Sequence, residues 1–147
     1  MNKLGEAIVL ATRAHAGQVD KGGQPYILHP LRVMLACKTE ATRIAAVLHD
    51  VVEDTGHALS DIASQFGWPI YDAVDALTRR SAETYPAFIK RCAANPIARI
   101  VKLADIGDNM DLSRLGREPT LEDTRRMNRY GDARNVLMLA GMGGSDD

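Results

Sequence analysis

A stretch with the sequence HDVVEDT, residues 49–55, gathers four ionisable side chains into six consecutive positions. They are His49, Asp50, Glu53 and Asp54. On a helix, residues three and four apart share a face, so the two pairs form acid-bearing layers one turn apart. Three carboxylates near a helix C-terminus oppose the helix dipole and repel one another. A bound divalent cation would offset this cost, so the stretch is either a solvated helix end or part of a metal site.

Two other segments supply candidate partners for this stretch. His29 ends a loop, and Asp105 lies in a mostly apolar helical segment, three residues after Lys102. Alone, each has an ordinary structural explanation, because an isolated loop histidine is usually structural and a buried aspartate can pair with a lysine. Together with His49 and Asp50 they form a set of two imidazoles and two carboxylates. That mixture suits borderline-to-hard metals such as manganese, iron or zinc.

Helical periodicity dominates the chain, and no segment has a convincing strand pattern. A first helix begins near Leu4 and ends by Gly17, and Thr120 with Asp123 resembles a capping box at the start of the last helix. Further helices are expected over residues 30–38, 39–54, 60–66, 69–78, 85–94, 96–110 and 120–140. The prediction is an all-α fold, a compact bundle of about six to eight helices. It places a single domain at residues 1–140 and a flexible tail at residues 141–147.

The composition is that of an ordinary globular domain. The chain has 147 residues, of which 46% are hydrophobic and 25% charged, and its net charge is −1. No basic excess is present to neutralise a nucleic-acid backbone, so we expect no nucleic-acid partner. No apolar run reaches the length of a membrane span or of a signal-peptide core, so we expect no membrane partner and a cytoplasmic location. Cys37 and Cys92 are far apart in the chain and are more typical of two reduced thiols than of a disulfide.

The candidate ligands match the H…HD…D signature of the HD-domain metal phosphohydrolases. Four segments resemble the hydrolase domain of Rel/SpoT-type enzymes: AHAGQ at residues 14–18, PYILHP at 25–30, AVLHDVVEDT at 46–55, and VKLAD at 101–105 followed by NM at 109–110. The resemblance covers residues 5–140, and without a synthetase domain the chain is similar to the small alarmone hydrolases. Members of that family remove the 3′-pyrophosphate from guanosine tetra- or pentaphosphate and use Mn²⁺.

The resemblance implies roles for ten residues. The metal ligands would be His29, His49, Asp50 and Asp105. The catalytic acids would be Glu53 and Asp54, whose separate roles the sequence leaves open. The substrate contacts would be Lys21, Asn109, Arg126 and Tyr130. This agrees with the chemistry, since a bound metal supplies hydroxide at neutral pH, a carboxylate can take up the proton, and cations neutralise phosphate.

The chain departs from the family pattern where the family recognises the base. The family's loop usually reads Arg-Lys-Ser-Gly-Glu-Pro-Tyr, whereas residues 20–26 read Asp-Lys-Gly-Gly-Gln-Pro-Tyr. Asp20 thus replaces an arginine that stacks on guanine in the family. Asp108 stands where His or Tyr is common, and Asp111 replaces a frequent Arg. The preference between guanine and adenine therefore stays open.

The main functional prediction is a metal-dependent enzyme that removes the 3′-pyrophosphate from (p)ppGpp or an adenosine analogue. One alternative is an HD phosphohydrolase acting on another nucleotide phosphate ester, such as NADPH or a nucleoside monophosphate. A second is a non-catalytic sensor that binds an alarmone. The expected partner is a small nucleotide substrate, and the sequence also leaves a homodimer open.

Overall fold

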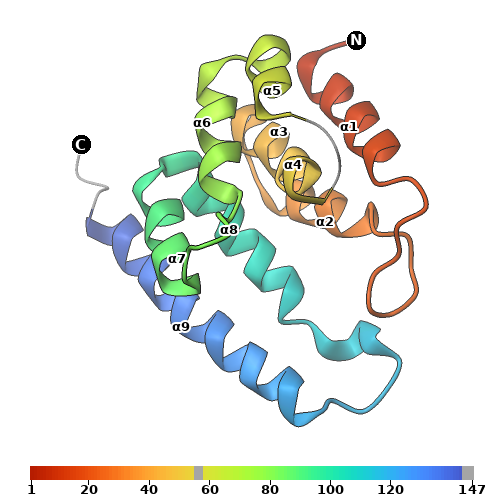
Figure 1. The fold of residues 1–147 in the computed structure, drawn as a ribbon, viewed down its shortest axis with the longest axis vertical. Helices are drawn as coiled ribbons and strands as arrows, with labels where there is room; N and C mark the ends of the chain where they lie inside the picture. Colours follow the sequence, from red (N-terminus) through yellow and green to blue (C-terminus); the bar gives the residue numbers. More distant parts are fainter. Residues whose placement is uncertain (55–57, 144–147) are drawn as a thin grey trace.

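The computed structural model describes residues 1–54 and 58–143. These residues form an all-helical bundle, as predicted, without a strand in the described part of the chain (Figure 1). The helices are α1 (Lys3–Ala14), α2 (Leu28–Ala36), α3 (Glu40–Leu48), α4 (Val51–Asp54), α5 (Leu59–Phe66), α6 (Trp68–Leu77), α7 (Tyr85–Ala94), α8 (Pro96–Asn109), the 3₁₀ helix η1 (Leu112–Leu115) and α9 (Leu121–Gly143). None of the described helices is long and apolar enough to cross a bilayer.

The predicted single helix over residues 39–54 is wrong, because the helix is interrupted between α3 and α4. At the break, the backbone N–H of His49 donates to the carbonyl of Ala46 at 3.4 Å, three residues back instead of four. The His49 imidazole Nδ1 lies 2.5 Å from the same carbonyl oxygen. A side chain thus takes one of the carbonyls that a helix leaves unpaired at its C-terminus. His49 and Asp50 therefore lie in a turn, and Val51 starts a new one-turn helix.

The last helix begins as its sequence predicts and ends later. The backbone N–H of Thr120 donates to Asp123 Oδ2 at 2.8 Å, and the N–H of Asp123 donates to Thr120 Oγ1 at 3.2 Å. This confirms the expected capping box. α9 continues to Gly143, beyond the predicted end at residue 140. Of the expected tail, residues 144–147 lie outside the described part of the chain.

The core is centred on α3, which packs against α1, α2, α6 and α8. The five residues 44–48 are all buried. A helix that is apolar all round has to be surrounded by other elements. α8 is the second central helix, since it also contacts α2, α6, α7 and α9. In Figure 1, α8 separates the α1–α3 side of the bundle from α9. The two thiols, Cys37 and Cys92, are free and buried.

The loop before α2 is a compact hairpin. An isolated bridge joins Val19 to Pro25, and the backbone N–H of Asp20 donates to the carbonyl of Gln24 at 2.8 Å. Gly22 lies at the tip, where an added Cβ would be 2.2 Å from the carbonyl oxygen of Arg114. Only glycine allows this close approach, so the loop is held against η1.

Candidate active site

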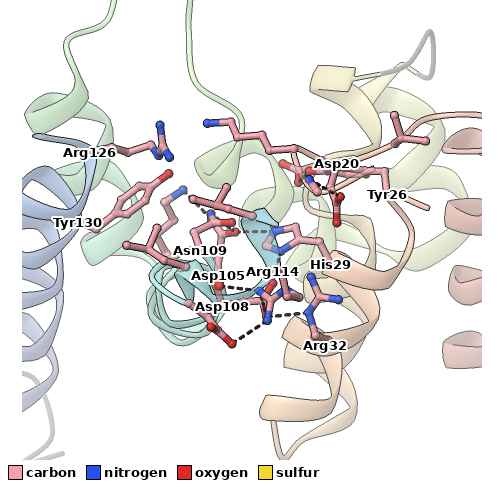
Figure 2. A pocket seen from close by; sticks show the side chains of 18 of the residues that line it. Asp20, Tyr26, His29, Arg32, Asp105, Asp108, Asn109, Arg114, Arg126 and Tyr130 are labelled. Carbon is pink, nitrogen blue, oxygen red and sulfur yellow. Dashed lines mark hydrogen bonds and ion pairs between the residues drawn. The ribbon is translucent and has the colours of Figure 1, made fainter. Parts of the chain in front are cut away.

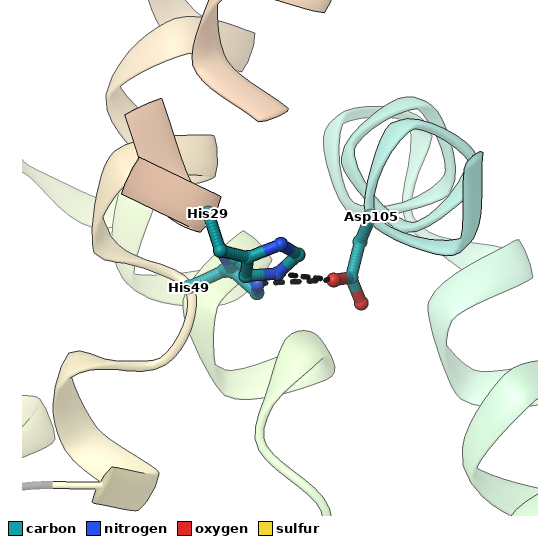
Figure 3. Close-up of side chains that lie close together, drawn as sticks. All are labelled: His29, His49 and Asp105. Carbon is teal, nitrogen blue, oxygen red and sulfur yellow. Dashed lines mark hydrogen bonds and ion pairs between the residues drawn. The ribbon is translucent and has the colours of Figure 1, made fainter. Parts of the chain in front are cut away.

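Three of the predicted metal ligands come together from three helices. His29 lies in the first turn of α2, His49 caps α3 and Asp105 lies in α8. Their ligand atoms all lie within 4.8 Å of one another (Figure 3). The three residues are 6%, 2% and 4% exposed, respectively. The contacts of α3 with α2 and α8 bring these residues together, although up to 76 positions separate them in the chain.

The two carboxylate oxygens of Asp105 have different partners. Oδ1 lies 2.8 Å from Nε2 of His29 and 3.4 Å from Nε2 of His49. It also accepts a hydrogen bond from Nδ2 of Asn109 at 3.2 Å. Oδ2 accepts from Nζ of Lys102 at 2.8 Å. Lys102 therefore fixes the carboxylate so that Oδ1 faces the two imidazoles.

Asp50, the fourth predicted ligand, lies at the edge of this cluster. Its Oδ2 is 3.0 Å from Nε2 of His49. The hydroxyl of Tyr26 donates a hydrogen bond to the same oxygen. Asp50 is more exposed than the other three ligands, with 19% of its side chain accessible. It therefore forms the side of the cluster that faces solvent.

The environment of His49 fits a cation bound in the cluster. Nδ1 bonds to the carbonyl of Ala46, so in a neutral ring the lone pair lies on Nε2. Nε2 is buried and has no hydrogen-bond partner among the described residues. The carboxylates of Asp50 and Asp105 lie near it, yet without hydrogen-bond geometry. A lone pair that faces two carboxylates is repelled unless a proton or a metal ion lies between them, and imidazole with carboxylate is a suitable donor set for a divalent metal.

The charges of the cluster agree with this assignment. Burial favours the neutral imidazole of His49, yet Asp50 and Asp105 raise its pKa well above the usual value. Burial alone would raise the pKa of Asp105, but Lys102 and His49 hold it well below its ordinary range. Burial opposes ionisation of Asp50 as well, and the neighbouring His49 lowers its pKa to about 2. The site thus keeps both carboxylates ionised and attracts positive charge.

A second layer of charged residues orients His29. Its Nδ1 lies 2.7 Å from Oδ2 of Asp108. The other oxygen of Asp108 is held by Arg32 Nε at 2.7 Å and by Arg114 Nη2 at 3.1 Å. A carboxylate on Nδ1 keeps the proton there and leaves Nε2 to a metal, a common arrangement for histidine ligands. From the sequence, Asp108 is recognisable only as a departure from the family pattern, and nothing in it predicts the roles of Arg32 and Arg114.

A cavity of about 460 Å³ opens beside the cluster (Figure 2). Its lining includes the ligands His29, Asp50 and Asp105 and the other predicted site residues Lys21, Glu53, Asn109, Arg126 and Tyr130. Arg126 and Tyr130 reach into it from α9, opposite His29 and Arg32 (Figure 2). The side chain of Asp54 lies outside the described part of the structure. The structure thus brings together the predicted metal ligands, one predicted catalytic acid and all four predicted substrate contacts.

Two cations face the cavity from different elements. Burial lowers the pKa of Lys21, and the charge of Arg126 lowers it further. Lys21 comes from the loop before α2, whereas Arg126 lies on α9 and donates from Nη2 to Asp123 Oδ1 at 2.6 Å. Two cations that repel each other across a cavity favour an anion between them.

Asp20 and Asp111 have local structural roles. The Oδ1 of Asp20 accepts hydrogen bonds from the backbone N–H groups of Gly22 and Gln24, both at 2.9 Å. Oδ1 of Asp111 caps η1 by accepting from the N–H of Ser113 at 3.0 Å. Asp20 therefore closes the loop, in place of the flat guanidinium that stacks on guanine in the family.

Comparisons with known proteins agree with this architecture. The sequence profile of the HD domain matches residues 7–115. A guanosine-3′,5′-bis(diphosphate) 3′-pyrophosphohydrolase of Aquifex aeolicus is 33% identical over 120 residues, which are 74% of this chain and 17% of that protein. A GTP pyrophosphokinase of Streptomyces coelicolor is 35% identical over 123 residues, or 75% of this chain and 14% of that protein. The chain therefore spans less than a fifth of the length of these curated relatives.

A solved structure shows the same fold over nearly the whole chain. It is that of a metazoan ortholog of SpoT, described as hydrolysing ppGpp and acting in starvation responses. The TM-score is 0.75 at 24% sequence identity, and the match covers 99% of this chain and 97% of that one. The resemblance inferred from the H…HD…D residues is confirmed: the chain belongs to the HD domain family.

Proposed function

We propose that this protein is a metal-dependent phosphohydrolase that removes the 3′-pyrophosphate from guanosine 3′,5′-bis(diphosphate) or a closely related nucleotide. One observation carries the proposal. Two imidazoles and two carboxylates, of which only Asp50 is partly exposed, adjoin a cavity that Lys21 and Arg126 also line. The names of the Aquifex relative and of the metazoan ortholog support this choice of substrate.

The metal would be held by His29, His49, Asp50 and Asp105, and we propose Mn²⁺ as the ion. When bound, a divalent ion lowers the pKa of water and polarises a phosphoryl oxygen. Lys102 and Asp108 would keep Asp105 and His29 in place for it, since each holds its ligand through a contact of 2.8 Å or less.

The remaining groups act on the substrate and on protons. Glu53 lines the cavity, and its Oε2 accepts a hydrogen bond from the backbone N–H of Arg79 at 3.3 Å. It is placed to take the proton from the attacking water as the oxygen–phosphorus bond forms. The bond between phosphorus and the ribose 3′-oxygen then breaks, and a proton goes to that oxygen. Lys21 and Arg126 would neutralise the departing pyrophosphate.

The direct test uses purified protein loaded with Mn²⁺ and the 3′,5′-bis(diphosphates) of guanosine and adenosine. We expect release of pyrophosphate, and a His49→Asn variant provides the inactive control. The same assay separates the alternatives. Inorganic phosphate in place of pyrophosphate would indicate a different phosphate ester as substrate, and tight binding without turnover would indicate a sensor. Absence of pyrophosphate from both nucleotides, with metal bound, contradicts the proposal.

The preference for a base is a separate question within this proposal. Asp20 is engaged in its own loop, so the cavity lacks the stacking arginine of the family. Comparing kcat/KM for the guanosine and adenosine substrates measures what this replacement does. A homodimer and a cytoplasmic location remain predictions from the sequence.

A further inference from the structure

A second cavity, of about 420 Å³, adjoins the candidate active site. We call it the arginine cavity, and it is lined by Arg79, Tyr85, Arg126, Arg129 and Tyr130. Arg126 and Tyr130 also line the first cavity, so the two cavities lie side by side and share two residues of their lining. Six carboxylate residues line the first cavity, whereas none of the described residues lining the second has a carboxylate. The arginine cavity is thus a basic extension of an otherwise mixed pocket.

Two of the carboxylates next to this cavity, those of Asp123 and Glu83, are already neutralised. Asp123, which binds Arg126, also binds Arg117 at 2.7 Å, so one carboxylate serves two guanidinium groups. Glu83 lies beside Arg79, but its carboxylate is held by Arg91 at 2.7 Å. A net positive charge is therefore left over around the cavity.

The groups lining the cavity are suited to bind phosphate oxygens. Arg79 is oriented by two contacts: its Nε donates to the carbonyl of Glu83 at 3.2 Å, and its Cζ lies 5.6 Å from the centre of the Tyr85 ring. The hydroxyl of Tyr85 is buried and has no hydrogen-bond partner among the described residues. A buried hydroxyl without a partner is costly, and an oxygen bound in the cavity would satisfy it. Guanidinium groups match the geometry of phosphate oxygens.

The arginine cavity is also connected to the proposed chemistry. The backbone N–H of Arg79 donates to Oε2 of Glu53, the proposed proton acceptor. A ligand that spans both cavities would therefore place one end at the metal ligands and the other beside Arg79 and Arg129.

We propose that the arginine cavity binds a second phosphate group of the substrate, the one on the 5′ side of the nucleotide. This inference depends on the proposed function, in which the 3′-pyrophosphate lies at the metal ligands. It assigns a specificity role to Arg79, Tyr85 and Arg129, for which the sequence alone predicts no role. The preferred substrates are thus nucleotides phosphorylated at both ends of the ribose.

The test compares two substrates in one variant. Guanosine 3′,5′-bis(diphosphate) has both phosphate groups, and guanosine 3′-diphosphate lacks the 5′ group. We expect Arg129→Gln to raise KM for the first about tenfold, as the loss of one charged hydrogen bond predicts. The same variant should leave kcat for the first nucleotide nearly unchanged, and also both kcat and KM for the second. Arg125→Gln is the matched control, because Arg125 is exposed on the same helix and lines neither cavity.

Two further measurements separate the possible outcomes. Tyr85→Phe removes only the hydroxyl and should weaken binding of the doubly phosphorylated nucleotide alone. Calorimetry measures the binding of both nucleotides directly, in the absence of metal. It tests phosphate binding in the arginine cavity even if no pyrophosphate is released, so a failure of the proposed function is distinguished from a failure of this inference. The inference is overturned if Arg129→Gln affects both nucleotides equally or behaves like Arg125→Gln. It is also overturned if the variant weakens only inhibition by inorganic pyrophosphate, because the cavity would then hold the product.

Discussion

The wall of the pocket built by α2, α3 and α8 differs sharply from the wall that α9 presents to it. On the first wall His29, His49 and Asp105 are buried, and each has a second residue that fixes one of its polar atoms. On the second wall Arg126 and Tyr130 are half-buried and Arg129 is exposed. The first wall has a ligand geometry set by packing, whereas the second presents positive charge. The pocket thus has its candidate metal ligands on one wall and unneutralised positive charge on the other, as a separation of the proposed bond cleavage from substrate recognition would require.

The largest effect is expected from breaking the first wall at Asp105. Asp105→Asn removes a ligand and leaves the largely buried Lys102 without its carboxylate. We expect loss of metal binding and of about 3–5 kcal/mol of stability, the usual result of breaking a buried ion pair. Urea unfolding and calorimetric metal titration measure the two losses.

A double variant separates these two losses. Adding Lys102→Met to Asp105→Asn removes the unpaired charge, so most of the stability should return while metal binding stays lost. If Asp105→Asn retained tight metal binding, the assignment of the first wall would be wrong.

A smaller effect is expected from Asp108→Asn, which changes a residue behind the ligand. The amide can still accept from His29 but no longer attracts Arg32 and Arg114, so metal affinity should fall about tenfold or more. Calorimetry gives the affinity, and the ¹⁵N shifts of His29 report which ring nitrogen has the proton. Asp111→Asn is the control, since Asp111 also binds Arg114 but does not touch His29. Equal effects of the two variants would remove Asp108 from the metal site.

The role of positive charge in recognition is tested by Lys21→Gln, because Lys21 comes from the loop before α2 and lines the same cavity as Arg126. The variant loses one cation that faces the cavity, so KM for the doubly phosphorylated nucleotide should rise severalfold to about tenfold, with the free energy of unfolding nearly unchanged. Raising the ionic strength should reduce the difference from the unmodified protein, because salt screens partly exposed charges. Lys38→Gln changes an exposed lysine that lines neither cavity and should have no effect. A fall in kcat alone would place Lys21 in the chemistry and not in recognition.

The smallest effect is expected from Glu83→Gln, which changes a residue beside the arginine cavity. Hydrogen bonds from Arg91 lower the pKa of Glu83 from 4.5 to about 2. A lowered pKa in the folded state adds stability above the unfolded value, and that stability is lost as the pH falls from about 4.5 to about 2. Glu83→Gln should therefore reduce the free energy of unfolding at pH 6 and have little effect near pH 2. Urea unfolding at several pH values checks this, and a difference independent of pH would contradict it.

Several elements could be predicted from the chain alone because their signals are local. The start of α9 follows from Thr120 and Asp123, which are neighbours in sequence and bond to each other. The start of α7 follows from Thr84, whose hydroxyl accepts from the N–H of Ala87. The break after Leu48 was missed, because helical periodicity continues across it and the bonds of His49 to the Ala46 carbonyl leave no signal in the sequence pattern.

The candidate site was only partly predictable for a related reason. His29, His49, Asp50 and Asp105 were selected by residue type and by resemblance to a family, and the fold brings them together. The role of Asp108 could not be read from the sequence, because its partner His29 is 79 positions away. Arg32 likewise has no local reason to contact Asp108, 76 positions later.

The sequence by itself determined which groups are available: the ligand residues, the apolar segment that becomes the centre of the core, and the caps that start the helices. These depend on residue type and on contacts within a few positions. The tertiary structure decided which nitrogen of His29 and of His49 faces the candidate metal site, which carboxylates are neutralised, and where positive charge is left over. Those properties depend on burial and on distances between helices, which local sequence does not specify.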